Sequence, residues 1–112
     1  MLETIAYKVL TAEQLTELQR GGWRGSALDL QDGFIHLSAA AQLTETVDKH
    51  FAGRSDLVVA AIDLAALGAA VRWEQSRGGA LFPHVYGDLP PSAVLAHAPL
   101  ARNGSGEVVR PA

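Results

Sequence analysis

The spacing of apolar and polar residues changes several times along the chain, and each change predicts a new element. Residues 5–10 are rich in β-forming side chains and predict a strand. Thr11 and Gln14 then have the spacing of a capping box, which predicts that a helix follows the strand directly. Leu15 and Leu18 would give this helix an apolar face.

Residues 39–51 predict the most regular helix, because apolar side chains recur there at intervals of three or four. Glu45 and Lys49 are spaced as an ion pair on one face of it. Four other segments have the composition of strands: residues 34–37, 57–62, 71–74 and 81–86. Residues 57–62 are apolar almost throughout, so we expect them to form a central strand covered on both faces.

The remaining segments predict connections. Residues 23–31 lack a clear period and predict a loop, which leads into a turn at Asp32-Gly33. Residues 101–112 predict either a terminal hairpin closed at Asn103-Gly104 or a frayed tail. We therefore predict a single small α+β domain over residues 1–112, with its core in residues 1–100.

Composition excludes several classes of protein. The chain has 112 residues, of which 48% are hydrophobic and 19% charged, as in a globular domain. A net charge of −3 argues against nonspecific binding to nucleic acid or an anionic membrane. Without cysteine or a long apolar run, we expect a cytoplasmic protein. The oligomeric state stays open, and no pair of histidines has the spacing that favours a metal site.

His36 is the first candidate for chemistry. Its predicted strand would deliver an imidazole, which exchanges protons near neutral pH, to the start of the following helix. Ser38 is expected to cap that helix and to add a hydroxyl to the same anion site. A half-buried histidine held by hydrogen bonds inside a sheet would have the same local sequence, so both interpretations stay open.

A second group of candidates lies between residues 73 and 86. Aromatic faces, a guanidinium, a carboxylate and an imidazole are combined there in Trp73, Glu74, Arg77, His84 and Tyr86. This mixture favours a nucleotide or another flat, phosphorylated ligand. The alternative is that the aromatic residues belong to the core, while Glu74 and Arg77 form an exposed pair.

The chain resembles the bacterial family known as domain of unknown function 952. The matching segments are Tyr7-Lys8, residues 33–38, His50-Phe51, Trp73-Glu74, Ser76-Arg77 and residues 82–87. The resemblance extends to about Val94 and implies no known reaction.

A more distant resemblance is to the ADP-ribosyltransferase fold, in which a split sheet holds NAD between three motifs. The similar segments are Tyr7-Lys8, residues 33–38 and residues 82–86. The resemblance implies a split, mainly antiparallel sheet flanked by two helices, with NAD or a related nucleotide as cofactor. Lys8, His36 and His84 all depart from the residues usual in the three motifs. In place of the usual glutamate, Glu74 on the neighbouring strand is the candidate carboxylate.

Three functions follow as hypotheses. The first is an enzyme that acts on a nucleotide, with a transferase-like activity as one alternative, in which His36 and His84 are acid and base and Lys8 or Arg77 holds phosphate. This hypothesis predicts that His36, Ser38, Arg77 and His84 line one concave pocket.

The second hypothesis is a non-catalytic module that recognises ADP-ribose or a related ligand by stacking on Trp23, Trp73 or Tyr86. The third is a two-histidine phosphodiesterase, because His36-Leu37-Ser38 fits one of the two His-x-Ser/Thr elements that such enzymes carry. The second element is missing, since neither His84 nor His97 is followed two residues later by Ser or Thr.

Overall fold

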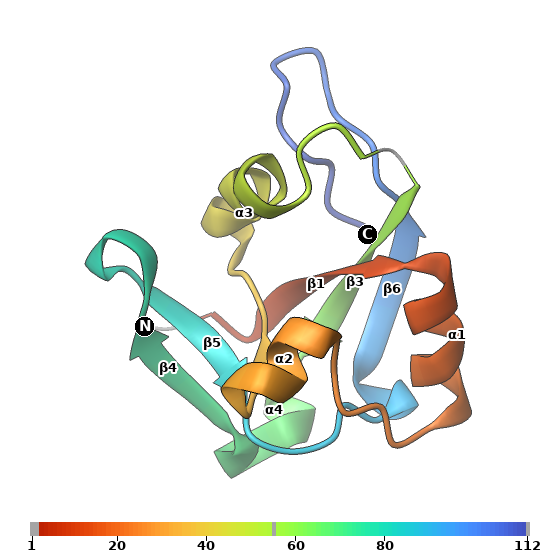
Figure 1. The fold of residues 1–112 in the computed structure, drawn as a ribbon, viewed down its shortest axis with the longest axis vertical. Coiled ribbons are helices and arrows are strands. Elements are labelled where there is room, and N and C mark those ends of the chain that lie inside the picture. Colours follow the sequence, from red (N-terminus) through yellow and green to blue (C-terminus); the bar gives the residue numbers. More distant parts are fainter. Residues whose placement is uncertain (1–2, 55, 112) are drawn as a thin grey trace.

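The computed structural model describes residues 3–54 and 56–111, and within them the strands form two separate three-stranded sheets (Figure 1). The strands are β1 (Ile5–Thr11), β2 (Ile35–His36), β3 (Leu57–Asp63), β4 (Val71–Gln75), β5 (Leu81–Val85) and β6 (Val94–Pro99). The helices are α1 (Ala12–Arg20), α2 (Ala27–Asp32), α3 (Leu43–His50) and α4 (Leu64–Leu67). The prediction of an α+β domain with a split antiparallel sheet is confirmed at this level, but the described part of the chain has about four helices instead of two.

The first sheet has the order β1-β3-β6, with β3 in the centre. Because successive side chains of a strand point to opposite faces, this sheet contributes residues to two apolar clusters, one on each face. Ala60 and Ile62 belong to one cluster with Leu18 of α1, whereas Val59 belongs to the other with Leu43 of α3. The prediction that residues 57–62 form a central strand covered on both faces is confirmed.

The second sheet has the order β2-β5-β4, and its two faces have different surroundings. Ile35, Val85, Val71 and Trp73 pack in or against the first apolar cluster. The opposite face carries His36 and His84, which are direct partners in the β2–β5 register. A backbone bridge between Tyr7 and Ser38 connects the two sheets.

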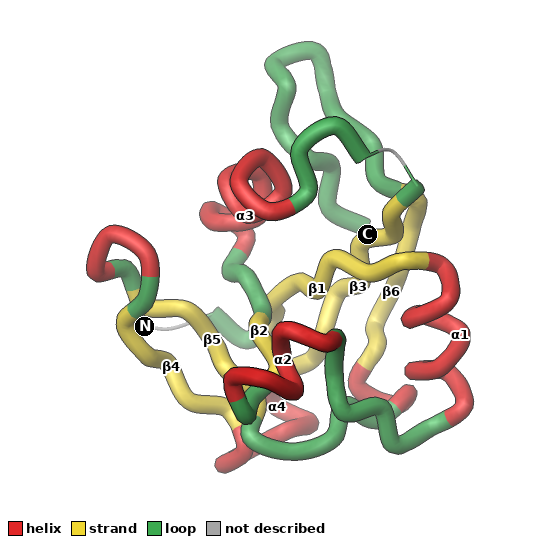
Figure 2. Tube along the Cα trace, viewed as in Figure 1, coloured by secondary structure: helices red, strands yellow, loops and turns green. Residues whose placement is uncertain are grey.

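Helix α2 lies in the segment that the sequence pattern predicts to be a loop, so that prediction is wrong. Figure 2 shows it as a short helix between two loops. Ser26 and Asp29 form a capping box at its start, and Gly33 ends it in the left-handed conformation with φ of 87°. The pattern Ser-x-x-Asp followed by Gly was the available signal, but six residues are too few to show a helical period.

Two capping predictions have different outcomes. Thr11 caps α1 through a complete capping box with Gln14, as predicted. Ser38 does not cap the next helix, because its hydroxyl bonds the Thr46 hydroxyl at 2.7 Å and a 3-10 turn, Ala40–Gln42, begins after Ala39.

The terminal segment folds back on itself through a turn. Arg102 and Val108 form a backbone bridge, and the Asn103 side chain accepts hydrogen bonds within the turn. Val108 is buried against the second apolar cluster, and its N–H donates to Thr44 in α3. Among the described residues, no helix has the length and hydropathy of a membrane span.

Candidate functional site

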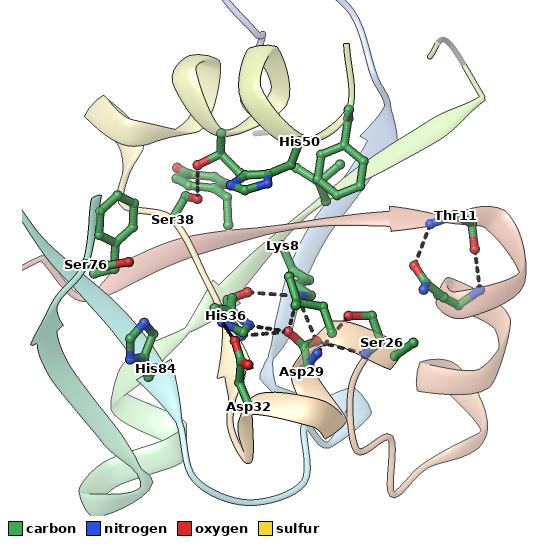
Figure 3. Close-up of a pocket in the computed structure, with 18 of the residues that line it drawn as sticks. Lys8, Thr11, Ser26, Asp29, Asp32, His36, Ser38, His50, Ser76 and His84 are labelled. Carbon is green, nitrogen blue, oxygen red and sulfur yellow. Dashed lines mark hydrogen bonds and ion pairs between the residues drawn. The ribbon is translucent and has the colours of Figure 1, made fainter. Parts of the chain in front are cut away.

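A cavity of about 560 Å³ lies between α3 and α2, beside β1 and the histidine-bearing face of the second sheet (Figure 3). Its polar lining includes Lys8, Asp29, Asp32, His36, Ser38, Thr46, His50, Ser76 and His84. Leu28, Phe51 and Phe82 contribute apolar surface to the same cavity. The cavity therefore combines apolar walls with a concentrated set of ionisable groups.

Asp29 is the central acceptor of this site, although its side chain is only 1% exposed. Its Oδ1 accepts from the His36 Nδ1 at 2.6 Å, the His36 backbone N–H at 3.1 Å and the Lys8 Nζ at 3.2 Å. Its Oδ2 accepts from the Ser26 N–H at 2.8 Å. Burial alone would raise the pKa of Asp29, but the hydrogen bond from His36 and the charge of Lys8 outweigh it and hold this pKa well below its usual range.

Lys8 is a buried cation whose partners are internal. Its ammonium lies 2.9 Å from Asp29 Oδ2 and donates to the His36 carbonyl at 2.9 Å. Burial lowers the pKa of Lys8, and the Asp29 carboxylate opposes that change. Lys8 lines the cavity, but its hydrogen bonds tie β1 to α2 and β2, so its placement supports a role in positioning these elements.

His36 lies between two carboxylates. Its Nδ1 is 2.6 Å from Asp29, and its Nε2 is 2.9 Å from Asp32, which comes from the last turn of α2. A neutral imidazole has only one N–H, so only the doubly protonated ring can donate to both carboxylates at once. When the ring is doubly protonated, each of its two N–H groups therefore has a carboxylate acceptor at the edge of the cavity.

His84 is oriented by Glu74. The carboxylate Oε1 of Glu74 lies 2.7 Å from His84 Nδ1 and also accepts from the Tyr86 hydroxyl at 2.8 Å. The hydrogen bond from His84 lowers the pKa of Glu74 most, and the one from Tyr86 lowers it further. The same hydrogen bond to Glu74 raises the pKa of Tyr86. The His84 side chain is 6% exposed and stacks on Phe34 at a ring distance of 4.0 Å.

His36 and His84 share one face of the second sheet and one cavity. Their ring centroids lie 5.5 Å apart, as expected for partners directly opposite each other on neighbouring strands. Among the described residues, His84 Nε2 has no hydrogen-bond partner. The predicted pocket thus brings together His36, Ser38 and His84, whereas the Arg77 side chain lies outside the part of the chain that the structure describes.

The three aromatic candidates for stacking lie elsewhere. Trp23 is buried in the first apolar cluster and Trp73 packs against that cluster. Tyr86 is 38% exposed, with the Arg72 guanidinium 4.8 Å from the centre of its ring. None of the three is among the described residues that line the cavity, so their placement supports packing roles for the tryptophans and a hydrogen-bonding role for Tyr86.

Several residues of the site were missed by the sequence interpretation. Asp29 and Asp32 lie on α2, where the sequence pattern predicts a loop followed by a turn at Asp32-Gly33, and their spacing of three gives no reason to connect them with His36. His50, at the end of α3, lines the cavity together with Thr46 and is not among the candidates chosen from the sequence. Their common face on α3 follows from the i,i+4 spacing, which was the one available signal.

The described residues include no group of three or more His, Asp or Glu side chains arranged to hold a metal ion. The carboxylates nearest to the cavity already have partners, because Asp29 and Asp32 contact His36 and Glu74 contacts His84. The chemistry that this arrangement can supply is that of oriented imidazoles: hydrogen bonding to an anion and transfer of a proton.

A small α+β domain with two carboxylate-held histidines in one cavity is thus the class of protein that the fold and the site define. The chain belongs to the family described as Protein of unknown function (DUF952), whose model matches residues 9–97. This confirms the first resemblance seen in the sequence.

Solved structures of protein CC0527 from Caulobacter crescentus are similar to this chain. The X-ray structure has 43% sequence identity, covers 95% of this chain and 94% of that chain, and has a TM-score of 0.84. The solution NMR structure has 43% identity, covers 94% of this chain and 91% of that chain, and has a TM-score of 0.78. A comparison with curated proteins finds no match.

Proposed function

We propose that this protein is an enzyme that acts on a nucleotide or an NAD-related phosphorylated ligand bound in the cavity. His84 acts as the general base, and the imidazolium of His36 stabilises negative charge on the ligand. The observation that carries the proposal is the pair formed by Glu74 and His84, placed beside the clamped ring of His36.

The physical basis for a base at His84 is its fixed orientation. An ionised Glu74 accepts a hydrogen bond from the N–H at Nδ1, and in this tautomer of the neutral ring the lone pair is on Nε2. A carboxylate that selects the tautomer and holds the ring is a recurring device for histidine bases. Glu74 is then a positioning residue, because its carboxylate contacts His84 and Tyr86 and is not among the described residues that line the cavity.

The cavity suits a small ligand with one flat apolar part and one charged part. Its volume of about 560 Å³ lies within the range of small-molecule sites, about 300–1,000 Å³. Leu28, Phe51 and Phe82 can contact a ring, while Ser38, His50 and Ser76 offer polar contacts. His36 adds the positive charge that a phosphate requires.

Likeness to ADP-ribosyltransferases remains part of this proposal. The split sheet supports it, as does the presence of Tyr7, Lys8, His36, Phe82 and His84, from the three similar segments, around one cavity. The proposal differs from the transferase pattern in its chemistry, because a histidine base replaces the usual ribose-binding glutamate. Removal of a proton from an attacking water or hydroxyl is a task for such a base, and it makes hydrolysis a candidate reaction.

A second candidate is a non-catalytic module for the same ligands, which is favoured by one observation. Both ring nitrogens of His36 already contact carboxylates of the protein itself. A group held in this way can attract an anion without exchanging protons with it. The two candidates share a ligand class and differ in whether a product forms.

The test is ligand binding followed by a search for product. We expect NAD, ADP-ribose, AMP or a cyclic nucleotide to bind in isothermal titration and to raise the melting temperature, because a ligand that binds only the folded state stabilises it. His84→Gln should bind the same ligand but lose turnover by about 10²–10⁴-fold. His97→Gln is the matched control, because His97 is exposed on β6, away from the cavity.

Each outcome separates the candidates. Binding with turnover that depends on His84 supports the enzyme. Binding without any product supports the module. If the intact protein binds none of these ligands, the proposal fails in both forms.

A further inference from the structure

Asp32 and Asp29 contact the same imidazole but differ in how firmly they are held. Asp29 is buried and accepts hydrogen bonds from Lys8, His36 and Ser26. The Asp32 side chain is 39% exposed at the end of α2. Among the described residues, His36 Nε2 is the one group with which its carboxylate forms an ion pair or hydrogen bond. The first carboxylate is therefore part of the scaffold, whereas the second can move away by rotation of its own side chain.

The position of Asp32 also favours its release. It is the last residue of α2 and is followed by Gly33, the left-handed residue that ends the helix. Carbonyl groups at a helix C-terminus carry partial negative charge, which makes this end unfavourable for an anion. The contact with His36 offsets that cost. When another anion occupies His36 Nε2, this contact is lost and the inward position of the Asp32 carboxylate is no longer stabilised.

The charges around His36 define what can replace Asp32. Lys8 and Asp29 neutralise each other, and Asp32 neutralises the imidazolium of His36. When the Asp32 carboxylate turns toward solvent, the three groups that remain, Lys8, Asp29 and the doubly protonated His36, carry a net charge of +1. The freed Nε2–H is then a hydrogen-bond donor at the lining of the cavity. The acceptor that suits a positively charged donor best is a negatively charged oxygen.

We propose that His36 Nε2 is an anion subsite of the cavity, and that Asp32 is a resident carboxylate which the phosphate of a ligand displaces. The inference deepens the proposed function, and it rests on the same cavity. It makes the phosphate the recognised group. It also makes Asp32 an internal competitor that weakens the binding of all anions and disfavours ligands that lack a phosphate.

The experiment compares Asp32→Ala with Asp88→Ala, which removes an equally negative but distant charge. Asp88 is exposed beside Arg24 and is not among the described residues that line the cavity. Inorganic phosphate and AMP are titrated into each protein, and the His36 ring resonances are followed by NMR. We expect Asp32→Ala to bind both anions more tightly, by up to about fivefold, since an exposed ion pair contributes little. Asp88→Ala should bind as the parent does.

Asp32→Asn is a second variant that keeps the shape of the side chain and removes its charge. We expect its affinity for phosphate to lie between those of the parent and Asp32→Ala, because a neutral amide oxygen can still accept from His36 but competes less well. Melting temperatures of all the variants without anion confirm that each is folded.

Two results would overturn the inference. One is an affinity of Asp32→Ala for phosphate equal to or lower than that of the parent, even if nucleotides bind the parent, in which case the proposed function stands alone. The other is the absence of phosphate binding by every variant. Conversely, tighter phosphate binding by Asp32→Ala together with no binding of any nucleotide supports the subsite and contradicts the proposed function.

Discussion

At the scale of single residues, one buried carboxylate organises the site. Asp29 neutralises Lys8, fixes the ring of His36 and caps α2 through Ser26. A buried charge is tolerated only when it is paired and hydrogen-bonded, and Asp29 meets both conditions. The histidine is therefore held by a residue from a neighbouring helix instead of by its own strand.

Asp29→Asn should destabilise the protein strongly. The amide retains one acceptor but presents N–H donors to Lys8, which leaves a buried ammonium without a carboxylate. We expect a loss of about 3–5 kcal/mol in the free energy of unfolding, measured by urea denaturation at pH 7. Asp88→Asn, at an exposed position, should change this free energy by less than about 0.5 kcal/mol.

The same pair of variants predicts a pH dependence. The pKa of Asp29 in the folded protein is lowered, whereas in the unfolded chain it has the ordinary value of about 4. The folded state therefore binds this proton less readily, so the stability from Asp29 is complete above pH 4 and is lost as the pH falls toward the folded pKa. Denaturation between pH 2 and 5 should show a shallower decline for Asp29→Asn than for the parent. Parallel curves would contradict the assignment.

At the scale of elements, α2 is the device that positions both carboxylates. Asp29 and Asp32 have the spacing i,i+3, which puts them on one side of the helix and around the same imidazole. The chain enters α2 through Gly25, which has φ of 118°. A Cβ added there would lie 2.5 Å from the Asp29 Cβ, so the glycine is required both for its backbone conformation and for the close approach.

Gly25→Ala should therefore disturb the site as well as the fold. We expect a destabilisation of about 1–3 kcal/mol from backbone strain, together with a shift of the His36 ring resonances as Asp29 is displaced. Gly104→Ala is the control, because Gly104 has no positive φ and its added Cβ meets no atom within 4 Å. Equal unfolding midpoints for the two alanine variants would show that the close contact with Asp29 is not needed.

At the scale of the whole molecule, two sheets and two apolar clusters are joined by shared strands. β1 places Ala6 and Leu10 in one cluster and Tyr7 and Val9 in the other. The Tyr7–Ser38 bridge then connects β1 to the end of β2, close to the histidine pair. Neither cluster can open without moving β1 and β3, so we expect the domain to unfold as one unit.

Leu43→Ala tests this coupling. Leu43 is buried in the second cluster, whereas both tryptophans, Trp23 and Trp73, report on the first. We expect a loss of about 2–5 kcal/mol, with the urea midpoints from tryptophan fluorescence and far-UV circular dichroism shifting together. A fluorescence midpoint that stays at the parent value while the dichroism midpoint falls would show that the clusters unfold separately.

Sequence patterns alone were enough to predict the class of fold, the family and most of the regular elements. β1, β3 and α3 could be predicted because a strand or helix that buries one or both faces repeats its apolar residues at a characteristic spacing. The candidate histidines could be chosen for their chemistry alone. Helix α2 could not be predicted with the same method, since six residues with exposed Leu28 and Leu30 show no such spacing.

The contacts among these residues depend on the folded chain and could not be predicted from local sequence. The contact of Lys8 with Asp29 spans 21 residues, and that of Lys8 with the His36 carbonyl spans 28, so no local pattern contains them. The pairing of His36 with His84 depends on the register of β2 and β5. A shift of one residue in either strand would move its histidine to the opposite face of the sheet. These long-range contacts bury and pair the ionisable groups of the cavity. Burial and pairing shift the pKa of a group, so local sequence could not predict the chemistry of the cavity.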